Sequence, residues 1–343
     1  MTVDDNSIDS DIEEELFEHY HFKVDPGQEI IRIDKYLLDR LPNTSRNKIQ
    51  IAARNGNIHV NGKKEKQNYK VKPGDEVAMV LPYPVRDFEL IPQDIPIDIV
   101  YEDNELLIVN KPANMVVHPG YGNYSGTLVN ALVYHINNLP NPPNDYYGRP
   151  GLVHRIDKHT TGLLVIAKTE IALTHLAKQF YDRTTERKYI ALVLGDLAEA
   201  GFIEGNIGRS LKNRKVMSVF PEGDFGKYAK THYKIIERFG LVTLIECKLE
   251  TGRTHQIRVH LQHIGHPLFN DLEYGGNKIL KGTASTSYRK FIENCFTLLP
   301  GQALHAKSLG LTQPYTKTKL FFESNLPPNF SNLLFKWRNY CNN

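Results

Sequence analysis

The chain has 343 residues, of which 41% are hydrophobic and 24% are charged. This composition excludes collagen-like and wholly disordered proteins, and the length is sufficient for two or three domains. The formal net charge of +3 hides an uneven distribution, because residues 1–24 contain eight acids and one base. Residues 25–343 carry +10, from 41 basic and 31 acidic residues. The near-neutral total therefore does not exclude a polyanionic partner.

Three cysteines, Cys247, Cys295 and Cys341, are widely spaced and odd in number, which argues against a disulfide framework or a CxxC metal site. The N-terminus has acids where a secretory signal needs basic and then apolar residues, and no apolar run reaches the length of a membrane span. We therefore expect a cytoplasmic protein without a membrane segment, and a monomer.

Residues 1–24 are expected to form a solvated acidic tail, although its last apolar side chains could pack on the body. A compact module is predicted over residues 29–84, where eleven bases and six acids give +5. Helical spacing predicts a first helix from Ile33 to Leu41, and Ser45 begins a second over 46–54. A strand over 58–60 and an Asn61-Gly62 turn complete a helix-helix-hairpin module.

A polar, proline-containing stretch over 85–97 is interpreted as a linker. Residues 98–325 then alternate strands with a few helices, which predicts an α+β domain with a mixed, largely antiparallel sheet. Residues 326–343 form a C-terminal segment, with a helix over 330–340 docked on the core. The other expected strands are 105–110, 151–154, 163–167, 189–194, 230–236 and 242–249, and the other expected helices are 127–136, 170–181 and 254–264.

A charged loop lies between two of these strands, with the sequence His154-Arg155-Ile156-Asp157-Lys158-His159-Thr160-Thr161-Gly162. A carboxylate between two cations should stay ionised at neutral pH and could act as a nucleophile or base. The alternative is that Asp157 caps its own turn while the bases are solvated. The sequence of this loop is compatible with both a catalytic and a turn-capping role for Asp157.

A second segment runs from Glu250 to His260, where Gly252 gives a turn, Thr254 can cap a helix and Arg258 follows one turn later. The alternative is an exposed basic helix. Its histidines also raise a metal hypothesis, but side chains five residues apart on a helix point about 140° apart. The loop 118–126 lacks the spacing of a nucleotide-phosphate loop, so we interpret it as the polar rim of a cleft.

Together these segments resemble the RluA-type pseudouridine synthases, and within them the RluD-like branch that acts on large-subunit ribosomal RNA. The segment 154–162 is similar to the family motif H-R-L-D-x-x-T-S-G, with Ile156 for Leu and Thr161 for Ser. Residues 253–258 match R-T-H-Q-I-R, residues 304–306 match L-H-A, and Lys188-Tyr189 corresponds by position to K-x-Y. The loop 118–126 indicates the RluD-like branch. Residues 29–84 resemble an S4 RNA-binding module, whereas residues 277–300 match poorly.

The resemblance implies a pseudouridine-synthase fold with a central cleft, preceded by a small α/β S4 domain of the αL type. It implies Asp157 as the catalytic carboxylate, Arg258 as its ion-pair partner, and Tyr189 as the residue that stacks on the flipped base or relays a proton. No metal or other cofactor is implied. Arg155 is the candidate to fill the space that the flipped base leaves. Further expected contacts to substrate or RNA phosphates are His154, Thr160, Arg253, Arg32, Arg46, Lys48, Arg54 and Arg209, the last in a cluster with Lys212, Arg214 and Lys215.

The expected function is conversion of specific uridines to pseudouridine, most directly in large-subunit (23S) ribosomal RNA. Three alternatives stay open at this point. The chain could bind ribosomal RNA during ribosome assembly without catalysis, it could modify transfer RNA, or its histidines could serve a metal-dependent hydrolase.

Overall fold

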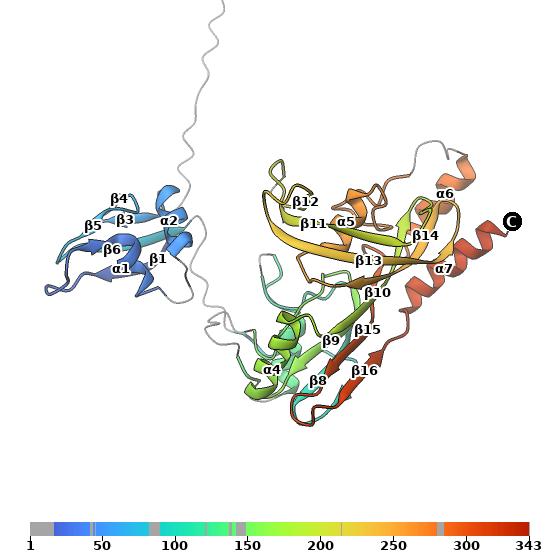
Figure 1. Cartoon of the computed structure of the whole chain (residues 1–343), viewed down its shortest axis with the longest axis horizontal. Coiled ribbons are helices and arrows are strands. Elements are labelled where there is room, and N and C mark those ends of the chain that lie inside the picture. The colour runs from blue at the N-terminus through green and yellow to red at the C-terminus, as the bar shows by residue number, and fades with distance from the viewer. Residues whose placement is uncertain are drawn as a thin grey trace, which may run out of the picture. The chain divides into compact units, whose positions relative to one another are not determined.

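A computed structural model describes residues 17–41, 44, 46–81, 90–120, 122–136, 139–141, 149–213, 215–279 and 285–342. The chain divides into two compact units, and their described parts are residues 17–81 and residues 90–342 (Figure 1). None of the described helices is long and apolar enough to cross a membrane.

The N-terminal unit is built on a four-stranded sheet in the order β1-β6-β3-β4. Its core is formed by apolar side chains that the two helices and the sheet bury together, including Ile33, Leu37, Ile49 and Ile58. The second expected helix and the expected strand over 58–60 are confirmed, whereas the first helix is present but ends at Leu38 instead of Leu41. Ser45 lies outside the described residues. The elements are β1 (Phe17–Lys23), β2 (Ile31–Arg32), α1 (Ile33–Leu38), α2 (Arg46–Arg54), β3 (Ile58–Val60), β4 (Lys63–Lys64), β5 (Lys70–Val71) and β6 (Glu76–Leu81).

Strand β1 corrects the expectation of a solvated tail through residue 24. It pairs antiparallel with β6, from Phe17 opposite Leu81 to Lys23 opposite Glu76. Phe22 packs against the core, with its ring centroid 6.5 Å from that of Tyr36. The apolar residues at the end of the segment alternate as a strand requires, and this pattern outweighs the local excess of acids. Residues 1–16 lie outside the described part.

The larger unit contains a ten-stranded sheet in the order β12-β11-β13-β14-β10-β15-β9-β8-β7, with β16 paired to β15. Strands β15 and β9 are parallel and the other pairs are antiparallel, which confirms the mixed, largely antiparallel sheet. Its strands are β7 (Ile99–Glu102), β8 (Leu106–Lys111), β9 (Thr161–Ala167), β10 (Glu186–Leu194), β11 (Gly201–Arg209), β12 (Met217–Phe220), β13 (Lys227–Arg238), β14 (Val242–Leu249), β15 (Leu304–Thr312) and β16 (Lys319–Glu323).

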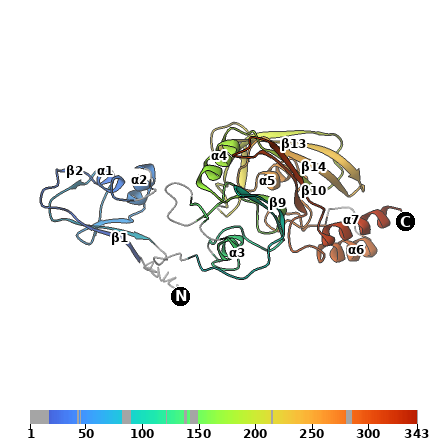
Figure 2. The ribbon, with the colours of Figure 1, turned by 90° about the horizontal axis from the view of Figure 1, so that it is seen from below.

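Helices cover both faces of the central strands (Figures 1 and 2). Successive β10 residues alternate between two cores: Tyr189 packs with residues of α3 and α5, whereas Ile190 packs with residues of α6 and α7. Helix α4 covers β8 and β9. Burial on both faces explains why β9 and residues 189–194 of β10 are apolar rather than alternating. The helices are α3 (Leu128–His135), α4 (Glu170–Tyr181), α5 (Gln256–His263), α6 (Thr286–Phe296) and α7 (Pro328–Cys341).

Two predicted elements of this unit differ from the structure. Residues 151–154 form no strand but only an isolated bridge between Leu152 and Ile166, because Gly151 has a φ of +69° and turns the chain. Helix α5 begins at Gln256, and its N-cap is His255 in a left-handed conformation. Thr254 therefore does not cap this helix.

The C-terminal segment belongs to the same compact unit as residues 98–325, so the boundary at 325 separates no independent part. The expected terminal helix is present as α7, and its Trp337 is fully buried. Helix α6 lies in the region that matches the family pattern poorly, and its Phe291 ring lies 4.9 Å from that of Trp337. The α6–α7 pair therefore completes one face of the core (Figure 2).

The close approach of β9 and β15 at Gly162 gives a first prediction. Gly162 has a φ of +108°, and a Cβ there would lie 2.3 Å from the carbonyl oxygen of Ala306. We expect Gly162→Ala to lower the free energy of unfolding by about 3 kcal/mol, through backbone strain and steric overlap. Urea unfolding followed by the fluorescence of Trp337, the single tryptophan, measures this change.

Gly240→Ala is the matched control, because Gly240 has a φ of +73° but no atom within 4 Å of the added Cβ. Its expected loss is about 1 kcal/mol, the cost of the left-handed conformation alone. Equal losses in the two variants would contradict the steric part of the argument.

Buried histidines of the larger unit give a pH prediction. Burial lowers the pKa of both His260 and His305 from 6.5 to about 4. As the pH falls, the unfolded chain therefore takes up protons at a higher pH than the folded chain does. The contribution of each histidine to the free energy of unfolding is complete above pH 6.5 and is lost as the pH falls toward 4. The loss reaches about 3 kcal/mol for each histidine. We expect His305→Gln to reduce the slope of unfolding free energy against pH in this window. Equal slopes in wild type and His305→Gln would refute the prediction.

Candidate active site

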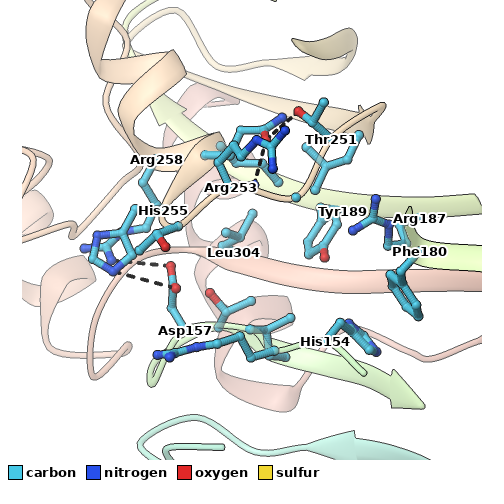
Figure 3. A pocket seen from close by; sticks show the side chains of 18 of the residues that line it. His154, Asp157, Phe180, Arg187, Tyr189, Thr251, Arg253, His255, Arg258 and Leu304 are labelled. Atoms are coloured by element: carbon cyan, nitrogen blue, oxygen red, sulfur yellow. Dashed lines mark hydrogen bonds and ion pairs between the residues drawn. The ribbon is translucent and has the colours of Figure 1, made fainter. Parts of the chain in front are cut away.

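A pocket of about 710 Å³ opens in the larger unit (Figure 3). Its walls come from segments that are distant in the sequence: the loop after Gly151, the end of α4 with the turn that follows it, the start of β10, and the segment from the end of β14 into α5. This pocket provides the central cleft that the fold class predicted.

The loop that carries Asp157 is held on both sides of this residue. Ile156 is buried in the core, and the Thr160 amide donates to the carbonyl oxygen of Asp157 at 3.1 Å. Thr160 is itself buried, and its Oγ1 accepts a hydrogen bond from Gln302 Nε2 at 3.2 Å. The Asp157 side chain keeps 21% of its surface exposed, so the loop presents a fixed carboxylate to the pocket.

A buried lysine at the end of β8 anchors the same loop. Lys111, the last residue of β8, is 1% exposed, and its ammonium group donates to the carbonyl oxygens of Pro112 at 2.7 Å, Met115 at 2.8 Å and Lys158 at 3.1 Å. Burial lowers the pKa of Lys111 to about 7, while the charge of Asp157 acts in the opposite direction. The ammonium group thus connects β8 to the residue that follows Asp157.

Arg258 of α5 is bonded to three carboxylates. Its Nη1 lies 3.4 Å from Asp157 Oδ2, its Nε and Nη2 bind Asp271 in a bidentate pair at 2.7 and 2.8 Å, and Nη2 also binds Glu273 at 2.6 Å. Burial opposes the positive charge, but the bonds to Asp271 and the nearby carboxylates raise the pKa of Arg258 above its ordinary value. Arg258 is therefore a permanent cation beside Asp157.

The turn before α5 is organised by Gln256. Its Oε1 accepts hydrogen bonds from Thr251 Oγ1 at 2.7 Å and from the Arg253 amide at 3.0 Å, and its Nε2 donates to the Lys230 carbonyl oxygen and to Thr231 Oγ1, both at 3.0 Å. These bonds attach the turn and the first residues of α5 to β13. They fix the place from which Arg258 reaches Asp157.

Tyr189 and Arg187 form the β10 wall of the pocket (Figure 3). Tyr189 is 7% exposed, and burial raises the pKa of its phenol, so the hydroxyl stays protonated at neutral pH. Arg187 is also buried, and its guanidinium lies 5.3 Å from the centre of the Phe180 ring. This wall therefore offers an aromatic surface beside a buried cation.

The structure brings together the expected site residues of the larger unit except Arg209; they are Asp157, Arg258, Tyr189, Arg155, His154, Thr160 and Arg253. The Nε2 atom of His154 already accepts the Val165 amide at 3.0 Å, and burial lowers its pKa to about 3. The Oγ1 of Thr160 is bonded to Gln302. These two side chains stabilise the loop, which argues against the expected substrate contacts through the same atoms. Arg155 is exposed, and Arg253 donates its Nε–H to the Tyr228 carbonyl oxygen at 3.0 Å.

The other predicted contacts lie outside this pocket. Arg32 and Arg46 donate to the fully buried carboxylate of Asp34 at 3.0 and 3.1 Å. Burial raises the pKa of Asp34, but the hydrogen bonds from Arg32, Gln50 and Arg46 outweigh it and lower the pKa to about 2. Arg54 donates to the Gln50 carbonyl oxygen. Asp34 thus holds two of the predicted basic residues side by side.

Arg209 is exposed at the end of β11, next to the turn that contains Lys212 and Lys215. Arg214 and the side chain of Lys48 lie outside the described part of the chain.

Several residues of the site were not predicted. Asp271 and Glu273 follow Arg258 by 13 and 15 residues, in a turn that no regular spacing connects to α5. Lys111 lies in none of the family motifs, and Arg187 precedes Lys188-Tyr189 in the K-x-Y region without an expected role of its own. His255 was considered only as a metal ligand, and its Nε2 lies 3.8 Å from Asp157 Oδ1. Within the described ranges, no group of three or more His, Cys, Asp or Glu side chains is placed to hold a metal ion.

Comparison with known proteins places these features in a family context. Residues 105–263 match the RNA pseudouridylate synthase family, and residues 31–77 match the S4 domain. An uncharacterized RNA pseudouridine synthase of Chlorobaculum parvum is 46% identical over 92% of this chain and 96% of its own. The ribosomal large subunit pseudouridine synthase D of Nitrosomonas europaea is 42% identical over 90% of this chain and 85% of its own. The solved structure of human RNA pseudouridylate synthase domain containing 4 has a TM-score of 0.53 at 25% identity, covering 70% of this chain and 93% of that chain.

The unequal burial of the Arg258 partners gives a third prediction. Asp271 is fully buried, so Asp271→Asn leaves a buried guanidinium short of one negative charge, and we expect the free energy of unfolding to fall by about 3 kcal/mol. Glu273→Gln makes the same chemical change at a side chain that is 50% exposed, and its cost should stay below about 1 kcal/mol. Urea unfolding of both variants tests this order, and a larger loss for Glu273→Gln would contradict it.

Proposed function

The chain belongs to the RNA pseudouridine synthase family, and from this premise we propose that it isomerises uridines of large-subunit ribosomal RNA to pseudouridine. The observation that carries the proposal is the carboxylate of Asp157, which faces a pocket of about 710 Å³ and contacts the permanent cation Arg258. The relatives named ribosomal large subunit pseudouridine synthase D support large-subunit ribosomal RNA as the substrate. The proposed setting is the cytoplasm, with the chain acting as a monomer.

The proposed chemistry needs an ionised carboxylate. The N-glycosidic bond of uridine breaks, the uracil turns, and its C5 forms the new bond to C1′; C5 loses a proton and N1 gains one, so there is no net oxidation. Asp157 would either attack C1′ as a nucleophile or remove a proton from the ribose. Both routes require a negatively charged carboxylate.

A uridine within folded RNA has to leave its stack to reach Asp157, at a cost of a few kcal/mol. Arg155 is exposed on the same loop, two residues before Asp157, and its planar guanidinium is suited to fill the space left by the base. Tyr189, with its protonated phenol, would stack on the extruded uracil or relay a proton. These three side chains therefore receive distinct proposed roles.

Affinity for the RNA backbone would come from basic residues outside the pocket. The N-terminal unit matches the S4 domain, and within it Asp34 holds Arg32 and Arg46 side by side, each partly exposed. Paired guanidinium groups can contact neighbouring phosphates, which is the main source of sequence-tolerant affinity. Arg54, Lys48 and Arg209 are proposed as further phosphate contacts.

A substitution of Asp157 tests the proposal. Asp157→Asn keeps the shape of the side chain but removes its charge, and we expect the rate of pseudouridine formation to fall more than about a thousandfold. Affinity for RNA should change less than about twofold. The assay uses ribosomal RNA with uridine tritiated at C5, prepared from cells that lack this gene product, and measures the tritium that purified protein releases, because the isomerisation leaves the mass unchanged.

Asp182→Asn is the matched control, since Asp182 lines the same pocket but forms an exposed pair with Lys178 at 2.6 Å. It should keep the wild-type rate. Full turnover by Asp157→Asn would refute the proposed mechanism. A wild-type chain that binds ribosomal RNA without forming pseudouridine would indicate an assembly factor, and modification of transfer RNA alone would correct the substrate.

A further inference from the structure

The two oxygens of Asp157 have different surroundings. Oδ2 contacts Arg258 Nη1 at 3.4 Å, whereas Oδ1 faces His255 Nε2 at 3.8 Å (Figure 3). The second distance is too long for a hydrogen bond, and Oδ1 accepts none from the residues that the structure describes. An imidazole thus stands close to the one oxygen that Arg258 does not hold.

The backbone of His255 has an uncommon conformation. Its φ of 55° and ψ of 23° lie in the left-handed region, and its side chain makes no capping hydrogen bond to α5. A residue other than glycine adopts this conformation at a cost of about 1 to 2 kcal/mol. This conformation places the ring between Asp157 and Tyr274, with its Nδ1 2.9 Å from the Tyr274 hydroxyl.

Hydrogen bonds around Tyr274 allow His255 to carry its proton on Nε2. The Met217 amide donates to the Tyr274 hydroxyl oxygen at 3.0 Å, and the hydroxyl hydrogen can be donated to His255 Nδ1. We assign this tautomer, in which Nδ1 accepts and Nε2 carries the proton of the neutral ring. In this tautomer the N–H group of His255 is directed at Asp157.

Charged groups surround this imidazole from several elements. Burial lowers the pKa of His255, and Arg258 acts in the same direction, while Asp157, Glu273 and Asp271 oppose them. The pKa remains below its ordinary value, so the ring is neutral at neutral pH. A neutral donor can hold Oδ1 without adding a second ion pair to the one that Asp157 forms with Arg258.

We propose that His255 is a second positioning residue for Asp157, which donates its Nε2–H to Oδ1 when bound uridine displaces water from the pocket. The inference rests on the proposed function. The loop fixes the backbone of Asp157, but a single contact of 3.4 Å on Oδ2 restrains the carboxylate only weakly about its Cβ–Cγ bond. Donors on both oxygens fix the plane of the carboxylate, and a misplacement of about 1 Å can cost about a hundredfold in rate.

Two amide substitutions of His255 separate this role from a structural one. The amide nitrogen of Gln reaches about as far as Nε2, whereas that of Asn reaches only as far as Nδ1. We therefore expect His255→Gln to stay within about fivefold of the wild-type single-turnover rate, and His255→Asn to lose about tenfold to a hundredfold. RNA affinity should be equal in all three proteins.

Stability should follow the opposite order, because Asn tolerates the left-handed conformation better than Gln does. A role confined to folding would make the rate follow stability, with Asn the better variant. A His255→Asn rate equal to or above that of His255→Gln would overturn the inference. The proposed function would still hold in that case, provided that the wild-type protein forms pseudouridine. Absence of pseudouridine with wild-type protein would overturn both.

Discussion

The buried guanidinium of Arg258 is the interaction on which the site depends. A buried cation is tolerated only when its charge and its N–H groups are matched, and here Asp271, Glu273 and Asp157 provide the partners. Asp271 accepts from Nε and Nη2 in a bidentate pair, which fixes the plane of the guanidinium and leaves Nη1 directed at Asp157. The two aspartates bonded to Arg258 thus have different roles. Asp271 is fully buried and stabilises the structure, whereas Asp157 is open to the pocket and is available for chemistry.

The sheet brings together the two segments that carry Asp157 and Arg258, which lie 101 residues apart in the sequence. Gly162 lets β9 approach β15 closely, Lys111 and Gln302 bind the loop before it, and Gln256 attaches the start of α5 to β13. Burial of the central strands on both faces makes this frame stiff. The pocket is therefore lined by side chains whose backbones have little freedom, as a reaction with a small and reorienting base requires.

Local signals were sufficient for some elements and not for others. Helix α4 runs over the predicted 170–181 because its periodicity and the Thr169 cap are encoded within one segment. Strand β1 was missed since its stability comes from pairing with β6, more than fifty residues away. The Asp157–Arg258 contact was expected only through the family motifs, and the Asp271 anchor was not expected at all, because nothing in its own sequence shows that it faces α5. Tertiary pairing, rather than local propensity, decides these cases.

We propose that the carboxylate of Asp157, oriented by Arg258, acts on the ribose of an extruded uridine. A crystal structure of the full chain bound to a fragment of large-subunit ribosomal RNA would show whether the two meet. We expect one uridine outside its stack, with C1′ against the Asp157 carboxylate, the uracil beside Tyr189, and Arg258 still bidentate to Asp271. A complex in which every base stays stacked and the pocket faces only phosphates would contradict it.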